Sequence, residues 1–285
     1  TTEIYTLSLH DALPIYKRIL EEQYPSMKAW VDYMIRESGE DYILDSGFHF
    51  GDWLSFAEYS SYNYNAPDYG YAGANTDKDL IATAYCYFSA GLLEKTASIL
   101  GKSEDANYLA GVRSKIMEAF QREFMTSTGR LSSNTQTAYI LGLSFGLLPD
   151  HLKEAAAKRL ADDVSYFGHL TTGFLGTPLI LSALSDNGYP VLAYMLLFNT
   201  RYPSWLYPVT MGATTIWERW DGLRPDSTFQ DSGMNSFNHY AYGAVGNWLY
   251  SRVAGLATDP EQPGFKNVII RPEFTAKLDF ARAEF

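Results

Sequence analysis

Cysteine is nearly absent from this chain of 285 residues, in which Cys86 is the only one. A single thiol cannot form an internal disulfide framework, and it cannot build a zinc site from cysteine ligands. Long apolar runs are missing too, because none reaches the roughly 18–20 residues that would cross a bilayer. We therefore expect no membrane partner and no cysteine-ligated zinc, and we also expect no other metal and no cofactor.

Basic residues are also few. The chain has 22 Lys and Arg against 33 Asp and Glu, which gives a formal net charge of −11 at pH 7. Binding to a nucleic acid needs a basic patch that neutralises phosphates, and no basic stripe is present here. An acidic carbohydrate would be repelled by the same charge. The charge balance therefore excludes a nucleic-acid partner and favours a neutral ligand.

Aromatic residues, by contrast, are abundant: 22 Tyr, 16 Phe and 6 Trp make up 15% of the chain. One interpretation is a helical core rich in aromatic side chains. The other is sugar binding, because aromatic faces stack on the C–H faces of pyranose rings while polar neighbours bind the hydroxyls. Composition by itself favours the core.

The first fifteen residues, TTEIYTLSLHDALPI, differ from the rest of the chain. Every residue of this segment can be back-translated into one reading frame of a widely used sequencing adapter. A secretory leader would contain a basic region followed by an apolar region, and neither is present. We therefore expect residues 1–15 to be a non-native segment, and we exclude His10 and Asp11 as site candidates.

From residue 16 onward, apolar residues recur with the spacing of amphipathic helices, and Pro25 is expected to interrupt the first helix and restart it. Residues 41–74 and 202–238 are rich in Gly, Asn, Pro and aromatic residues, and we expect long functional loops there. Alternating apolar residues indicate strands over 267–271 and 278–285. Helices are predicted over residues 16–38, 77–100, 103–124, 134–145, 150–165, 173–184, 190–199 and 239–255.

Consecutive helices without strands between them indicate helix-on-helix packing, as an α-solenoid or a closed α-toroid. The sequence contains no fixed-period repeat of the solenoid type, and long inward loops suit a toroid better. The predicted fold class is therefore mainly α. Residues 16–257 are expected to form a toroid domain, and residues 258–285 the start of a β domain.

The densest cluster of reactive side chains is GATTIWERWDG, in which Glu218 is flanked by Trp217, Arg219, Trp220 and Asp221. Glycoside hydrolysis uses two carboxyl groups, and in the inverting reaction one of them deprotonates a water. Nearby indoles can orient a sugar, and a nearby cation keeps a carboxylate ionised. The alternative is a loop-stabilising ion-pair network of Glu218 and Arg219, with the tryptophans as anchors. These residues alone leave both interpretations open.

Residues 16–285 resemble the C-terminal part of bacterial α-L-rhamnosidases of glycoside hydrolase family 78. The resemblance rests on the stretches EEQYPSMKAWVDYM, GFHFGDWL, GHLTTGFLGTP, YPSWLYPVTMGATTIWERWDG, GMNSFNHYAYGAVGNWLY and PGFKNVIIRP. WERWDG and NSFNHYAYGAVG are the most specific of these. The resemblance implies a toroid of six helical hairpins, an (α/α)6 barrel, followed by a β-sandwich. It also implies inverting hydrolysis of terminal α-L-rhamnose from a rhamnose-containing glycoside or oligosaccharide.

Site residues follow from the same resemblance. Glu218 falls on the family's general base, and His239 falls on a histidine that bonds sugar hydroxyls. Trp53, in GDWL, looks like a tryptophan that contacts the sugar ring. Asp52 and Trp217 are further candidates for the substrate pocket, and each can equally be a structural residue. Without the resemblance, His239 would be expected to cap backbone groups at a helix start.

The sequence departs from the family in one respect that bears on function. The family's general acid and several rhamnose ligands lie in an Asp- and Glu-rich motif upstream, and residues 16–74 contain no equivalent. Several toroid helices and most of the β domain also have no counterpart. We therefore expect an incomplete toroid that carries the base side of the site and hydrolyses no rhamnoside on its own.

Two other functions fit the same residues. The chain can be a non-catalytic carbohydrate-binding α-toroid protein that keeps the aromatic pocket without turnover. It can also be a toroid lyase that acts on uronic-acid polysaccharides, although the net charge of −11 disfavours acidic substrates.

Overall fold

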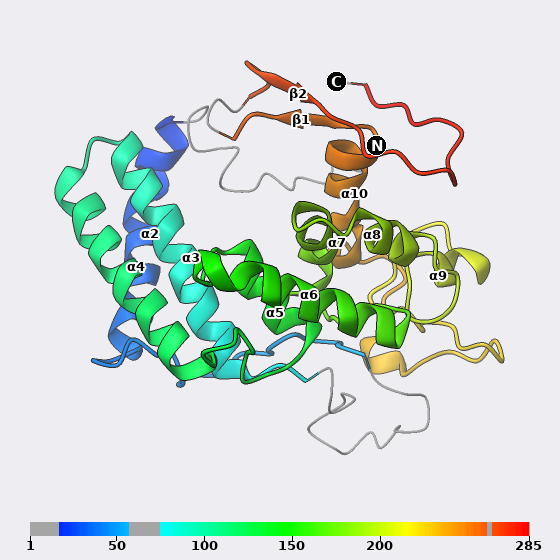
Figure 1. Ribbon diagram of the computed structural model, residues 1–285, viewed down its shortest axis with the longest axis horizontal. Helices are drawn as coiled ribbons and strands as arrows, with labels where there is room; N and C mark the ends of the chain where they lie inside the picture. The colour runs from blue at the N-terminus through cyan, green and yellow to red at the C-terminus, as the bar shows by residue number, and fades with distance from the viewer. Residues whose placement is uncertain (1–16, 57–74, 261–263, 285) are drawn as a thin grey trace.

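The computed structural model describes residues 17–56, 75–260 and 264–284, and most of the regular structure in these ranges is helical (Figure 1). The adapter-like residues 1–15 lie outside the described residues, as does the second half of the predicted loop 41–74. The α-helices are α2 (Lys17–Glu37), α3 (Lys78–Ile99), α4 (Ser103–Phe124), α5 (Gln136–Ser144), α6 (Asp150–Phe167), α7 (Thr177–Asp186), α8 (Pro190–Leu197), α9 (Leu206–Thr210) and α10 (Val245–Trp248). The remaining elements are η2 (Ser232–Met234), η3 (Ala241–Ala244), η4 (Leu249–Val253), β1 (Leu256–Thr258) and β2 (Val268–Ile270).

The hairpin of α3 and α4 shows how the sequence sets the helix limits. The carboxylate of Asp77 caps α3 by accepting the N–H of Asp79 at 3.1 Å. Gly101, at φ +73°, follows the helix and turns the chain, a backbone conformation that glycine adopts without strain. Glu104 and Asp105 lie in the first turn of α4, where negative charge is favoured by the helix dipole. Both predicted helices are therefore confirmed within one or two residues.

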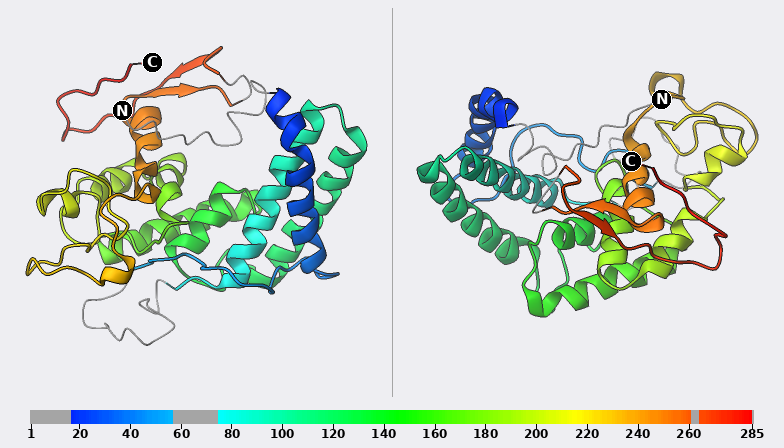
Figure 2. Two further views of the ribbon diagram at one scale, coloured as in Figure 1. Left: turned by 180° about the vertical axis from the view of Figure 1, so that it is seen from behind. Right: turned by 90° about the horizontal axis from the view of Figure 1, so that it is seen from above.

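The helices pack in sequence order, α2 on α3, α3 on α4, α5 on α6 and α7, and α7 on α8. Seen from above, they follow an open arc from α2 at one end to α10 and the 202–238 segment at the other (Figure 2). The core between them contains side chains with no exposed surface, such as Leu80, Leu93, Ile116, Phe120 and Ile140. Within the described ranges, no helix has both the length and the apolar character that spanning a bilayer requires.

A two-stranded antiparallel sheet follows the last helix. β1 pairs with β2 in the register Leu256↔Ile270, Ala257↔Ile269 and Thr258↔Val268. β2 confirms the strand predicted over 267–271, whereas β1 was not anticipated. Residues 278–284 form no strand, so that prediction was wrong. The large apolar side chains of this segment, Leu278 and Phe280, are exposed. In the described chain β2 pairs only with β1, so residues 278–284 have no partner strand.

Two helix predictions also need correction. Pro25 does not interrupt the first helix: it lies inside α2 on the exposed side, where solvent can hydrate the carbonyl that proline leaves unpaired. The helix predicted over 239–255 is instead a succession of the 3₁₀ turn η3, the short α10 and the π turn η4. Gly243 and Gly246 interrupt its helical propensity, which explains the mixed geometry.

Candidate active site

A buried carboxylate joins the loop before α3 to the loop before α7. Asp52 is 8% exposed. Its Oδ2 accepts hydrogen bonds from the Thr137 hydroxyl at 2.5 Å and from the Gly173 N–H at 2.8 Å. Its Oδ1 accepts the N–H groups of Leu175 at 2.7 Å and Gly176 at 3.1 Å. Both oxygens are thus occupied by donors from the protein, and we call this arrangement the Asp52 clamp.

Two glycines make the clamp possible. A Cβ atom added at Gly173 would lie 2.2 Å from the Trp53 carbonyl oxygen and 2.4 Å from that of Asp52. A Cβ at Gly176 would lie 2.4 Å from Thr137 Oγ1. Real Cβ atoms essentially never come this close to other atoms. Glycine is therefore required at residue 173 for the loop to lie against residues 52–55, and at residue 176 for it to lie against Thr137.

Trp53 and His239, which are far apart in sequence, are connected through one residue of this loop. The Phe174 N–H donates to the Trp53 carbonyl at 2.9 Å, and its ring stacks on the His239 imidazole with centroids 5.1 Å apart. On the other side, the Trp53 ring contacts Phe50 edge-on at 5.3 Å. Trp53, Phe174 and His239 are each half-buried, so all three lie near the surface of the packed helices.

The His239 imidazole has a defined orientation. Its Nδ1 accepts the N–H of Ala241 at 3.3 Å, at the start of η3. In the neutral ring the proton therefore lies on Nε2, which has no hydrogen-bond partner among the described residues. The Tyr240 ring stacks on the imidazole at 5.4 Å. The contact with Ala241 is the helix-start cap expected for this histidine from sequence, and it leaves Nε2 able to donate to a ligand.

Glu218 is held beside His239 by two hydrogen-bonded segments. The Glu218 N–H donates to the Ser236 carbonyl at 2.8 Å, and the His239 N–H donates to the Ile216 carbonyl at 2.8 Å. The Ser236 N–H also donates to the Glu218 carboxylate, at Oε2, over 2.9 Å. Within the described part of the chain, Oε1 has no hydrogen-bond partner. The half-buried carboxylate is thus anchored through one oxygen only.

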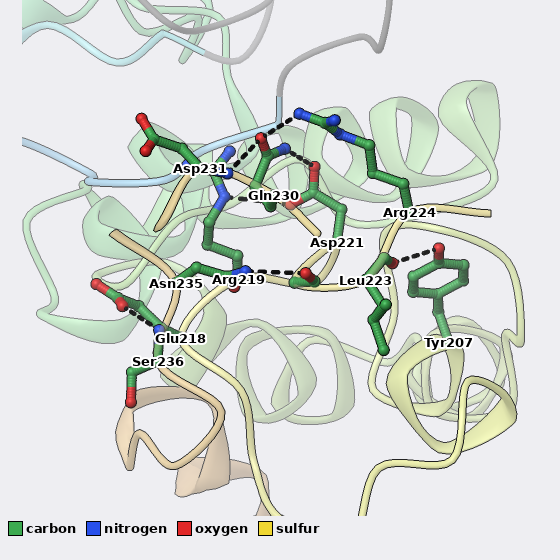
Figure 3. Close-up of polar contacts among 11 residues, drawn as sticks. Tyr207, Glu218, Arg219, Asp221, Leu223, Arg224, Gln230, Asp231, Asn235 and Ser236 are labelled. Carbon is green, nitrogen blue, oxygen red and sulfur yellow. Dashed lines mark hydrogen bonds and ion pairs between the residues drawn. The ribbon is translucent and has the colours of Figure 1, made fainter. Parts of the chain in front are cut away.

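Arg219 forms an ion pair with a second carboxylate of the motif. Its Nε pairs with Asp221 Oδ1 at 3.2 Å, and the Gln230 amide donates to Asp221 Oδ2 at 2.6 Å. Arg224 in turn donates to Gln230 Oε1 at 2.8 Å. Figure 3 shows Glu218 and Ser236 together at one edge of the view, apart from this network. Asp221, which is 2% exposed, rather than Glu218, is the carboxylate of the ion-pair network that stabilises the loop.

Both tryptophans of the WERWDG motif are buried and pack on other aromatic rings. Trp217 is 5% exposed and meets Phe237 edge-on at 4.9 Å, while Trp220 stacks on Tyr242 at 3.8 Å and 7°. Burial raises the pKa of the Tyr242 phenol well above its ordinary value, and the negative charge of Asp52 acts in the same direction. The Tyr242 hydroxyl stays neutral, and it has no hydrogen-bond partner among the described residues.

The structure treats the five predicted site residues differently. It connects Trp53, His239 and Glu218 through adjoining contacts, and each keeps some exposed surface. It buries Asp52 and Trp217 among protein groups, a setting that suits the structural alternative for both. Burial raises the pKa of the Asp52 carboxyl, although the hydrogen bonds from Thr137 and the backbone act in the opposite direction.

Sequence reasoning missed Phe174, Tyr242 and Ser236. The Gly-flanked GFLG stretch was a signal for the first of these, since paired glycines often mark a close approach of backbone. Ser236 gave no signal, because it acts through its main-chain N–H. Among the described residues, no group of three or more His, Cys, Asp or Glu side chains is placed to hold a metal ion.

The chain is similar to known proteins of one family. The family described as the bacterial α-L-rhamnosidase six-hairpin glycosidase domain matches residues 16–253. An α-L-rhamnosidase of Streptomyces avermitilis is 42% identical over 270 residues, which cover 94% of this chain and 24% of that protein. One of Alteromonas sp. is 41% identical over 269 residues, 93% of this chain and 28% of that protein.

The crystal structure of the Streptomyces avermitilis α-L-rhamnosidase complexed with L-rhamnose superposes with a TM-score of 0.80 at 41% identity. The match covers 90% of this chain and 23% of that one. This chain therefore spans about a quarter of the length of the relatives it matches. The predicted helical toroid architecture is confirmed, and the chain belongs to the bacterial α-L-rhamnosidase six-hairpin glycosidase family.

Proposed function

We propose that this chain contributes the general-base side of an inverting α-L-rhamnosidase that releases terminal α-L-rhamnose from glycosides. The observation that carries the proposal is the Glu218 carboxylate. Its Oε2 is fixed by the Ser236 N–H at 2.9 Å, while no described residue bonds Oε1. A general base needs a fixed position and one oxygen that is able to take a proton.

In the proposed reaction, Glu218 Oε1 accepts a proton from a water that attacks the anomeric carbon on the face opposite the leaving group. The new C–O bond then has the inverted configuration, so the first product is β-L-rhamnose. The leaving oxygen must be protonated by a second carboxyl group. By the family resemblance that group belongs to a region upstream of residue 16, and we propose that the longer protein supplies it.

Binding of the sugar is assigned to the residues beside the base. The half-exposed Trp53 ring offers a face for the C–H groups of a pyranose. His239, with its proton on Nε2, offers a donor to a sugar hydroxyl. Asp52 and Trp217 remain candidates for the pocket, and their burial supports a role in shaping it. We likewise keep the division into a toroid domain, residues 16–257, and a following β domain, residues 258–285.

The test is the Glu218→Gln substitution in this chain fused behind the N-terminal region of the Streptomyces avermitilis relative. Glutamine keeps the size and one acceptor oxygen, but it cannot accept the proton of the attacking water. We expect kcat on an aryl rhamnoside to fall by roughly 10²–10⁴-fold. We expect KM to change only a few-fold and the melting temperature to stay the same. Azide should restore turnover by attacking in place of water, giving a β-rhamnosyl azide.

Trp53→Ala and His239→Ala serve as matched controls. They should raise KM and gain nothing from azide, because they act through contacts present in the ground state. An unchanged kcat together with a lowered melting temperature for Glu218→Gln would make Glu218 a scaffold residue. Sugar binding without any turnover in the fused parent protein would favour the non-catalytic carbohydrate-binding protein.

A further inference from the structure

Phe174 is the described residue that contacts both proposed sugar-binding residues, and it does so through different parts of its structure. Its backbone N–H donates to the Trp53 carbonyl at 2.9 Å, and its ring lies against the His239 imidazole at 5.1 Å with an angle of 26° between the planes. The edge of the same ring meets the buried Tyr242 at 5.2 Å and 78°. Trp53 and His239 are separated by most of the chain, so their relative position depends on this link.

The backbone of Phe174 has almost no freedom to move. The residues on both sides of it, Gly173 and Leu175, donate their N–H groups to the two oxygens of Asp52, at 2.8 and 2.7 Å. Gly173 packs so closely on residues 52–55 that a Cβ there would overlap the Trp53 carbonyl. The Asp52 clamp therefore fixes the Cα–Cβ direction of Phe174, and the edge-on contact with the buried Tyr242 restrains the rotation of the ring.

The ring in turn limits how the imidazole can rotate. The His239 ring stacks on the rings of Phe174 and Tyr240, and its Nδ1 accepts the Ala241 N–H at 3.3 Å. Tyr240 is 82% exposed, so it restrains the imidazole less than the half-buried Phe174 does. Removing the Phe174 ring would leave the imidazole with one long hydrogen bond, to the Ala241 N–H, and one exposed neighbour, Tyr240.

We infer that Phe174 is a positioning residue, held by the Asp52 clamp, that sets the orientation of the His239 Nε2–H relative to Trp53. The expected effect of Phe174 on the affinity for rhamnose rests on the proposed function. Its structural part, the restraint of the imidazole by the Phe174 ring, does not depend on any activity. The two parts can therefore be measured separately.

The structural part is tested by NMR on this chain labelled at its five histidines, with His239→Ala to assign the resonance. The His239 imidazole stacks on the Phe174 ring, and we expect the ring current to shift its C–H resonances upfield. In Phe174→Leu, which keeps an apolar side chain, we expect these resonances to move downfield. Phe174→Tyr, which keeps the ring, should restore the parent position. Phe145→Leu is the matched control, since it makes the same change at a half-buried ring that contacts Tyr85 and Phe88.

The functional part is tested by titrating the same variants with L-rhamnose in the fused protein, which restores the upstream rhamnose ligands that the family resemblance implies. Phe174→Leu should weaken binding roughly three- to tenfold, the range expected from loss of one aromatic contact. In the His239→Ala background the same change should have less than a twofold effect, because the residue through which it acts is gone. Phe174→Tyr and Phe145→Leu should bind as the parent does.

Three outcomes decide between the possibilities. A His239 resonance that does not move in Phe174→Leu overturns the inference, whatever the affinities are. Effects of Phe174→Leu and His239→Ala that simply multiply overturn it as well, since the two residues then act independently. Shifted resonances together with a fused parent protein that binds no L-rhamnose support the positioning role and count against the proposed substrate.

Discussion

Asp52 and Glu218 are both carboxylates in glycine- and aromatic-rich loops, and both lie beside residues proposed to bind a sugar. Asp52 accepts four hydrogen bonds over its two oxygens and is 8% exposed. Glu218 is half-buried and accepts one hydrogen bond, from the Ser236 N–H. A carboxylate whose lone pairs are all engaged holds the fold together, whereas one that is fixed through a single oxygen retains the capacity to take a proton.

The largest expected effect is a difference in stability between variants of the structural carboxylate, Asp52, and of the proposed base, Glu218. Asp52→Ala leaves four buried donors without an acceptor, and we expect it to lower the free energy of unfolding by on the order of 3–5 kcal/mol. Glu218→Ala loses one contact at a half-exposed site and should cost less than about 1 kcal/mol. Urea denaturation of the two variants measures the difference. Equal losses would contradict the contrast between a structural and a chemical carboxylate.

A second expected effect tests the close approach that the Asp52 clamp requires. Gly173→Ala places a methyl group against the Trp53 carbonyl, and we expect a loss of about 1–3 kcal/mol through the resulting displacement of the loop. Gly111 is the control: it lies in α4 with open space around the position of a Cβ. Gly111→Ala should raise stability by about 0.5–1 kcal/mol, because alanine is the better helix former. A stable Gly173→Ala protein with parent-like melting would show that the loop tolerates displacement.

The smallest expected effect concerns two buried tyrosines. Tyr139, in the core, donates its hydroxyl to Asn134 Oδ1 at 2.6 Å, whereas the hydroxyl of Tyr242, near Glu218, has no partner in the described chain. Removing an unpaired buried hydroxyl relieves its desolvation cost, so Tyr242→Phe should be neutral or stabilise by up to about 1 kcal/mol. Tyr139→Phe should destabilise by about 1 kcal/mol. A thermal melt of each variant gives the sign, and a destabilised Tyr242→Phe would reveal that its hydroxyl has a hydrogen-bonding role.

Local patterns predicted the regular helices of this chain well. Asp77, Gly101 and the acidic first turn of α4 fix helix limits within a few residues, so the sequence alone located them. The misplaced elements depend on neighbours instead. Residues 278–284 alternate like a strand but have no partner strand in the described chain, and Pro25 is accommodated because its side of α2 faces solvent.

The candidate site was predictable where chemistry is concentrated in one short motif. WERWDG indicated Glu218, and the family resemblance added His239 and Trp53, which the structure connects through Phe174. The ion pair of Arg219 with Asp221 was not anticipated from the sequence. The Asp52 clamp could not be foreseen, since its backbone donors lie 121 to 124 residues further along the chain.

The hydrogen bond that orients Glu218 comes from the main chain of Ser236 and not from its side chain. Every amino acid except proline supplies the same N–H group. The contact with Glu218 therefore places no demand on the side chain of residue 236, whose hydroxyl instead accepts the Asn238 N–H at 3.2 Å. A comparison of sequences would pass over this residue, because a contact made by the backbone leaves no record in the choice of side chain.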